Sequence, residues 1–153
     1  MSAILERAAI EGYLPHREPF LFLDRVVALE REGTPPALTA EWCVPATADF
    51  FRGHYPGNPI TPGVILCEHT FQAAAVLLCA SGEVFGATRD VPVLARIEKA
   101  KFRRLVRPGE LLTTRVTLVE KVGPASFLEA KSAVDGATAL ELRCVLAKGS
   151  EGT

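Results

Sequence analysis

The sequence predicts an α+β domain in which an antiparallel sheet wraps around one long central helix. The segment from Pro62 to about Cys79 is apolar almost all round, so other structure must cover every side of the helix expected there. The C-terminal half supplies this cover, because it contains four stretches typical of strands, separated by turn signals. A chain of 153 residues has the size of one domain, so residues 1–153 are expected to fold as a single unit.

The N-terminal third predicts a short helix and a β-hairpin. Residues 3–10 have a helix-forming composition and are followed by a glycine stop signal. Residues 20–30 and 37–44 are rich in β-branched and aromatic side chains and flank a turn signal at 33–36, which indicates two strands of a hairpin. Prolines and glycines then crowd residues 45–63, so we expect a long loop of defined shape there.

The central helix and the strands after it have boundary signals in the sequence. Thr61 is expected to cap the helix, with Pro62 as its first residue and Ser81-Gly82 as its stop. Asp135-Gly136 is typical of a two-residue hairpin turn. The strands predicted for the C-terminal half are residues 91–106, 111–122, 126–134 and 138–148.

Composition and charge exclude several classes of protein. The 17 Lys and Arg nearly balance the 18 Asp and Glu, and a net charge of −1 gives no positive field for nucleic acid. The four cysteines are widely separated, which favours a reduced, cytoplasmic protein. Residues 64–80 include Glu68 and His69 and are too polar and too short to span a membrane. Glu6 and Arg7 interrupt the first apolar stretch, unlike in a signal peptide.

Two titratable residues are candidates for catalysis. His54 lies among prolines and glycines, where a rigid backbone can hold an imidazole against a ligand, although a solvated loop histidine would fit the same pattern. Glu68 lies in the second turn of the predicted helix, too deep to cap it or to complement its dipole. A carboxyl group on an apolar helix must be paired, protonated or functional, and a buried pair with an arginine is the alternative to function.

Together these residues favour acid–base chemistry. A neutral imidazole can act as the base, and a carboxyl group that keeps its proton can act as the acid. The backbone N–H of Gly63, at the helix N-terminus, could hold a carbonyl oxygen as negative charge develops on it. A base, an acid and an oxyanion donor are what a β-elimination next to a carbonyl group requires.

The same residues carry a resemblance to a known family. The motifs that carry it are Leu14-Pro15-His16-Arg17, Pro19-Phe20, Asp24-Arg25-Val26, the run from Gly53 to Pro59, Pro62-Gly63-Val64 with Glu68, the run from Ala100 to Arg104, and Val106-Arg107-Pro108-Gly109. On these residues, from about residue 14 to residue 147, the chain resembles the 3-hydroxyacyl-(acyl-carrier-protein) dehydratases of the FabZ type. The resemblance implies a hot-dog fold and a homodimer with both active sites at the subunit interface; related enzymes assemble further into hexamers, and the choice between dimer and hexamer stays open.

The resemblance also implies a role for each candidate residue. His54 would remove the C2 proton of a 3-hydroxyacyl thioester, and Glu68 of the partner subunit would protonate the departing hydroxyl, giving a trans-2-enoyl thioester and water. Gly63 N–H would bind the thioester carbonyl, Val64 would adjoin the substrate, and Gln72 would orient Glu68. No metal or redox cofactor is needed. Glutamate rather than aspartate at the acid position favours dehydration without isomerisation.

A basic cluster and two departures from the family pattern concern substrate choice. Lys99, Lys101, Arg103 and Arg104 could meet the acidic carrier protein and the phosphate of its pantetheine arm, although a solvated strand face explains the same charges. Residues 90–94 lack the tyrosine that gates the acyl tunnel in the family, and Arg96 replaces a usual glycine. Acyl length therefore stays open, as does the choice between housekeeping fatty-acid synthesis and a specialised pathway.

Other functions were weighed against dehydration. A hot-dog thioesterase would not need a histidine in the Gly-His-x-Pro-Gly frame, and a non-catalytic acyl-binding subunit would lose one member of the acid–base pair. A metal site at Cys67 and His69 is disfavoured because side chains two residues apart on a helix diverge by about 200°. Cys67 lacks a paired base that would make it a nucleophile, and His16 is interpreted as structural.

Overall fold

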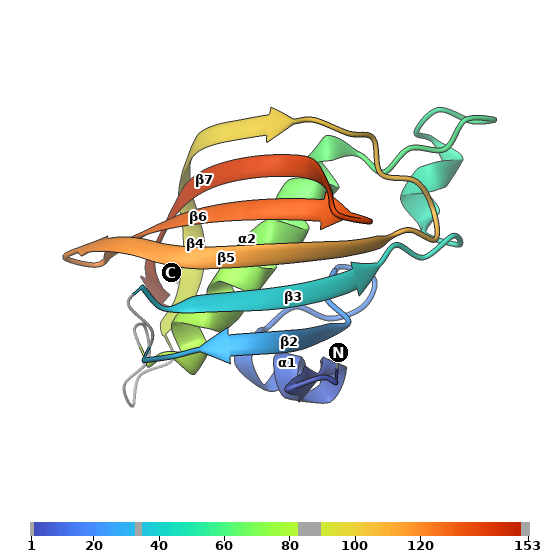
Figure 1. The fold of residues 1–153 in the computed structure, drawn as a ribbon. Coiled ribbons are helices and arrows are strands. Elements are labelled where there is room, and N and C mark those ends of the chain that lie inside the picture. Colours follow the sequence, from blue (N-terminus) through green and yellow to red (C-terminus); the bar gives the residue numbers. More distant parts are fainter. Residues whose placement is uncertain (1, 33–34, 83–89, 151–153) are drawn as a thin grey trace.

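The computed structural model describes residues 2–32, 35–82 and 90–150 and contains a seven-stranded sheet curved around one long helix. All neighbouring strands are antiparallel, in the order β1-β2-β3-β5-β6-β7-β4 (Figure 1). The elements are β1 (Leu5–Glu6), α1 (Arg7–Tyr13), β2 (Arg25–Glu30), β3 (Ala37–Cys43), the 3-10 turn η1 (Asp49–Arg52), α2 (Gly63–Ala80), β4 (Asp90–Phe102), β5 (Leu111–Val122), β6 (Ala125–Val134) and β7 (Ala137–Ser150).

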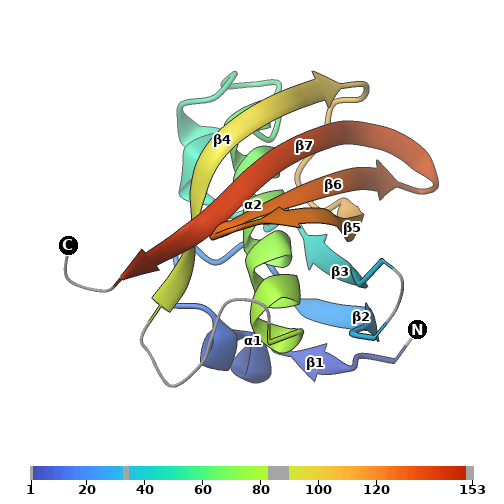
Figure 2. The same cartoon turned by 90° about the vertical axis from the view of Figure 1, so that its left-hand side faces the viewer.

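Helix α2 fills the concave side of the sheet, as predicted for a helix that is apolar all round. Figure 2 shows the strands curving from β4 round to β1, with α2 inside the curve. By length and composition α2 could cross a membrane, with a mean hydropathy of 1.6 over 18 residues, but 67% of it is buried within the fold. The α+β class and the wrapped central helix are therefore confirmed.

The start of α2 differs from the sequence prediction. Pro62 has a ψ of 135°, so the helix begins at Gly63 and no side chain caps it. Thr61 does not act as the cap, because its backbone N–H donates to the carbonyl of Val106 at 2.8 Å. This bond commits Thr61 to the segment before β5, and its hydroxyl is buried without a partner among the described residues. The end of α2 matches the prediction, since Gly82 adopts a φ of 71° just beyond the C-cap.

Several strand and helix boundaries were also misplaced. Strand β2 begins at Arg25 rather than at residue 20, because side chains of α2 take the backbone groups of Phe22. Helix α1 occupies residues 7–13 instead of 3–10 and continues through Gly12, with Ile10 completely buried. The Asp135-Gly136 turn is confirmed, with φ values of 49° and 78°. Residues 33 and 34 of the expected hairpin turn lie outside the described residues.

A buried histidine joins α2 to the segment before β2 and to strand β5. The side chain of His69 is completely buried; its Nδ1–H donates to the carbonyl of Phe22 at 2.6 Å, and its Nε2 accepts from the Thr114 hydroxyl at 2.7 Å. Thr114 is in turn 2.7 Å from the hydroxyl of Ser132 on β6. The Trp42 ring stacks on the imidazole, with centroids 5.7 Å apart. Burial lowers the pKa of His69 to about 4.

The buried histidine predicts a pH-dependent stability. Between the ordinary pKa of 6.5 and the folded value of about 4, the unfolded chain binds a proton that the folded chain does not. The stabilisation is present above pH 6.5 and is lost as the pH falls toward 4. Urea unfolding at fixed protein concentration should show the wild type losing about 1 kcal/mol more than His69→Gln between about pH 7.5 and 5.5. Parallel losses in the two proteins would contradict this account.

Candidate active site

His54 is held in the loop between η1 and α2 with one ring nitrogen free. Its Nδ1 lies 2.8 Å from the carbonyl oxygen of Ile60, which can only accept, so Nδ1 carries the proton. The loop keeps its shape through positive φ angles at Tyr55 (58°) and Gly57 (85°). Arg107, from the loop before β5, donates to the side chain of Asn58 at 2.8 Å. In its neutral form the half-buried imidazole therefore presents the lone pair of Nε2, which is what a general base requires.

Glu68 projects from the second turn of α2 and retains 23% of its side-chain exposure. Its Oε1 accepts a hydrogen bond from Nε2 of Gln72 at 3.1 Å and lies 3.4 Å from Nε2 of His16. Among the described residues, no arginine pairs with Glu68. Its partners are Gln72 and His16, so the buried pair with an arginine, weighed as the alternative to function, is not formed. The carboxyl group is therefore partly exposed and held from one side.

The amide of Gln72 has one orientation, set by its neighbours. Its Oε1 accepts the backbone N–H of Phe22 at 2.8 Å, which leaves Nε2 to donate to the carbonyl of Phe20 at 3.0 Å and to Glu68. The side chain is 1% exposed, so these bonds are made away from water. Gln72 thus contacts Glu68 through an amide of fixed orientation, and its role in orienting the carboxyl group stays a prediction.

A pocket of about 310 Å³ opens beside Glu68. Apart from His16, Glu68 and Gln72, its lining is apolar; the other lining residues are Pro15, Phe71, Ala75, Val91, Pro92, Val93, Leu94 and Leu146. Such a lining suits an alkyl chain leading away from a polar reacting group. His54 does not line this pocket, so a single chain does not bring the two candidate catalytic residues together there.

The N-terminus of α2 offers backbone donors near an aromatic ring. Gly63 and Val64 are the first two residues of the helix, so their N–H groups have no intrahelical acceptor. A Cβ on Gly63 would come within 3.0 Å of the Phe102 ring, which explains why glycine fits there. The side chain of Val64 is 75% exposed. Gly63, which carries the proposed oxyanion donor, is itself partly buried against the end of β4.

The basic cluster on β4 is divided by acidic partners. Arg104 forms two hydrogen bonds of 2.9 Å with Glu110, and this pairing lowers the pKa of Glu110 to about 2. Lys99 and Arg103 share Glu141, at 3.9 and 3.1 Å. Only part of the cluster is thus available to a partner.

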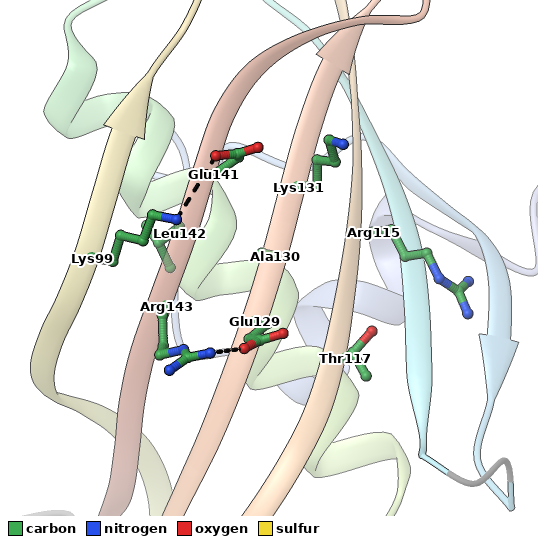
Figure 3. A pocket seen from close by; sticks show the side chains of 9 residues that line it. All are labelled: Lys99, Arg115, Thr117, Glu129, Ala130, Lys131, Glu141, Leu142 and Arg143. Carbon is green, nitrogen blue, oxygen red and sulfur yellow. Dashed lines mark hydrogen bonds and ion pairs between the residues drawn. The ribbon is translucent and has the colours of Figure 1, made fainter.

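Figure 3 shows Lys99 of this cluster among other charged side chains, on the face of the sheet away from α2. The hollow there, of about 330 Å³, is lined by Lys99, Arg115, Thr117, Glu129, Ala130, Lys131, Glu141, Leu142 and Arg143. Arg143 pairs with Glu129 across the strands, and Arg115 pairs with Glu30 at 3.1 Å. The hollow is a mixed-charge surface rather than a second acid–base site.

Two parts of the site were not foreseen from the sequence. His16 was interpreted as structural, but it stands against Glu68 and lines the same pocket. Residues 91–94, which lack the tyrosine typical of the family, form an aliphatic wall of that pocket. The four cysteines are free thiols, and burial raises the pKa of Cys67. Among the described residues, no group of three or more His, Cys, Asp or Glu side chains could hold a metal ion.

The wrapped helix, the histidine loop and the glutamate on α2 define a hot-dog-fold protein with candidate acid and base residues. The chain belongs to the FabA-like domain family, whose model matches residues 14–143. It is 34% identical over 140 residues to the 3-hydroxyacyl-(acyl-carrier-protein) dehydratase FabZ of Coxiella burnetii, covering 92% of this chain and 96% of that protein. It is 39% identical over 127 residues to the FabZ of Oenococcus oeni, covering 83% and 87%.

Solved structures agree on the fold. A dehydratase heterocomplex from Xenorhabdus doucetiae matches with a TM-score of 0.74 at 17% identity, covering 93% of this chain and 91% of that one. A thioesterase from Pseudomonas aeruginosa matches with a TM-score of 0.61 at 16% identity, covering 81% and 79%. Because dehydratases and thioesterases share this fold, the fold alone does not choose between the two reactions.

Replacing Gln72 should separate its structural bonds from its contact with Glu68. Gln72→Leu leaves the N–H of Phe22 and the carbonyl of Phe20 without their side-chain partner, and should lower the free energy of unfolding by about 1–3 kcal/mol. Glu68→Gln keeps those two bonds and should change it by less than about 1 kcal/mol. Chemical denaturation of both variants measures this difference, and equal losses would show that the amide does not hold Phe20 and Phe22.

Proposed function

We propose that the protein dehydrates a 3-hydroxyacyl thioester, carried on acyl-carrier protein, to a trans-2-enoyl thioester and water. The relatives named as FabZ dehydratases support this reaction, because they match most of the chain in both directions. The observation that carries it is the hydrogen bond from His54 to Ile60, which leaves Nε2 unprotonated in a rigid loop. The pathway is fatty-acid synthesis or a specialised acyl pathway.

The proposed reaction uses three groups. Nε2 of His54 takes the C2 proton, and the electron pair of the broken C–H bond moves into the thioester as an enolate. Gly63 N–H, at the positive end of α2, stabilises the negative charge on the carbonyl oxygen. The pair then returns to form the C2–C3 double bond as the C3–O bond breaks, and Glu68 donates its proton so that the hydroxyl leaves as water. Proton transfer from His54 back to Glu68 through solvent completes the cycle.

We propose that each active site combines His54 of one copy with Glu68 of a second copy. The pocket of one chain contains Glu68 but lacks His54, so the site is incomplete without a partner. Strand β4 supports this arrangement, because it ends the described sheet with an edge that can pair with another strand. Its exposed apolar side chains, between 42% and 51% accessible, are Val93, Leu94, Ile97 and Phe102. Pairing through this edge would bury them beside Gly63 and the pocket.

The carrier protein is proposed to meet the exposed cations of β4. Lys99 and Lys101 alternate along β4 opposite Arg143 and Glu141, and Arg103 follows just after the strand. Lys101 has no acidic partner among the described residues. Arg104 is committed to Glu110 and contributes less. We further propose that the enzyme works in the cytoplasm, which the widely separated cysteines favour, and that it forms a homodimer, as the resemblance implies. The resemblance leaves open whether these dimers assemble further into a hexamer.

The reaction itself is tested by mass spectrometry of a thioester panel. Wild-type protein should remove one water, about 18 Da, from 3-hydroxyacyl thioesters, and His54→Ala should lower the rate by about 100-fold or more. Presenting each acyl group on carrier protein and on coenzyme A shows which carrier is used. Release of free acid from saturated acyl thioesters would instead make the protein a thioesterase. No reaction of any thioester, with the fold intact, would favour an acyl-binding subunit.

Sharing of the site between copies is tested by mixing two inactive variants. A heterodimer of His54→Ala with Glu68→Ala contains one intact site and one doubly altered site. Random exchange between equal amounts should therefore restore about a quarter of the wild-type activity. Subunit exchange is confirmed with differently tagged chains, and no recovery after confirmed exchange would show that both residues act within one chain.

A further inference from the structure

We infer that His16 is a positioning residue that, together with Gln72, makes Oε1 of Glu68 an acceptor and leaves the catalytic proton on Oε2. This inference deepens the proposed dehydration and rests on it for its kinetic part. It concerns a histidine that the sequence interpretation treated as structural. The observations that support it are the fixed backbone of His16, the surroundings of its two ring nitrogens and the geometry of Glu68.

The backbone around His16 is clamped by the next residue. The guanidinium of Arg17 donates to the carbonyl of Leu14 at 2.8 Å and to the carbonyl of His16 itself at 2.7 Å. A third bond of 3.0 Å reaches the carbonyl of Glu11 at the end of α1. Leu14 is buried, and the ring of Phe20 lies nearly parallel to the imidazole, 18° apart with centroids separated by 6.4 Å. These contacts fix the loop around His16 and hold its imidazole toward the pocket.

The two ring nitrogens of His16 have opposite surroundings. Nδ1 is buried and has no hydrogen-bond partner among the described residues. A proton on that nitrogen would be a buried donor without an acceptor, which is costly, so the neutral ring keeps its proton on Nε2. Nε2 lies 3.4 Å from Oε1 of Glu68. This contact is longer than a hydrogen bond, and such contacts commonly shorten when an active site binds its substrate.

Gln72 supplies the second donor to the same oxygen. Because its amide oxygen is occupied by the N–H of Phe22, only its NH₂ can face Glu68, at 3.1 Å from Oε1. Once the His16 contact shortens in the substrate complex, Oε1 accepts from two donors and has no lone pair left for a proton. The carboxylic acid must therefore hold its proton on Oε2, which is the oxygen free to meet the substrate hydroxyl. After the transfer, both donors stabilise the charge left on the carboxylate.

Two amide substitutions distinguish a donor at Nε2 from a merely structural ring. The amide nitrogen of glutamine can reproduce the position of Nε2, whereas that of asparagine reproduces the position of Nδ1. We expect His16→Gln to keep kcat within about three-fold, and His16→Asn and His16→Leu to lower it by about ten-fold or more with little change in KM. Thermal unfolding checks that all three variants fold. Wild-type kcat in His16→Leu, or equal losses in the two amide variants, would overturn the inference.

Nitrogen NMR of the imidazoles tests the same inference without activity. The chain has 3 histidines, so ¹⁵N-labelled wild type gives few signals to assign, with single-histidine variants identifying each. At neutral pH His16 should be the Nε2–H tautomer, whereas His54 and His69 should be Nδ1–H tautomers. Glu68→Leu should shift the Nε2 resonance of His16. An Nδ1–H tautomer of His16 would refute the inference, and inactivity of the wild type with the expected tautomer would refute only the proposed reaction.

Discussion

The arrangement of the molecule depends on how the polar side chains of α2 bind the backbone of the segment before β2. A helix that is apolar on every side has no strong preference for one rotation in its core. His69 and Gln72, one turn apart, remove this freedom because they take the carbonyl and the N–H of Phe22. The rotation that satisfies both bonds also turns Glu68 toward the pocket. Buried polar groups of this kind specify one packing and are costly to leave unpaired.

The features predictable from the sequence were those set by local pattern. The apolar length of α2, the Asp135-Gly136 turn and the four C-terminal strands each depend on neighbouring residues, and all are confirmed, although the first of these strands ends at Phe102 rather than at residue 106. The errors arose where a distant partner overrides a local preference. Thr61 has the composition of a cap but is held by Val106. The stretch from residue 20 has the composition of a strand, but α2 takes its hydrogen bonds.

The candidate site shows the same division. His54 and Glu68 stood out because proline, glycine and an isolated charge on an apolar helix are visible in sequence. His16 did not, since its partner lies far along the chain and the clamp by Arg17 is a three-dimensional relation. The absence of His54 from the pocket is equally invisible from sequence spacing. Because His54 is absent from the pocket, the edge of β4 bears on catalysis. On the proposed arrangement, a second copy paired there would both complete the site and cover the exposed apolar side chains.

The wall formed by residues 91–94 has a consequence for how substrates are selected. An aromatic gate admits chains of different length by swinging a single side chain, at the cost of one rotamer change. Here the wall belongs to a strand whose backbone is paired with β7, so moving it would break sheet hydrogen bonds. On the proposed function, a wall that keeps its position would limit the length of the acyl chain by the bulk of Val91, Val93 and Leu94. Exchanging one of these aliphatic side chains for a smaller one would then lengthen the acyl chain that fits.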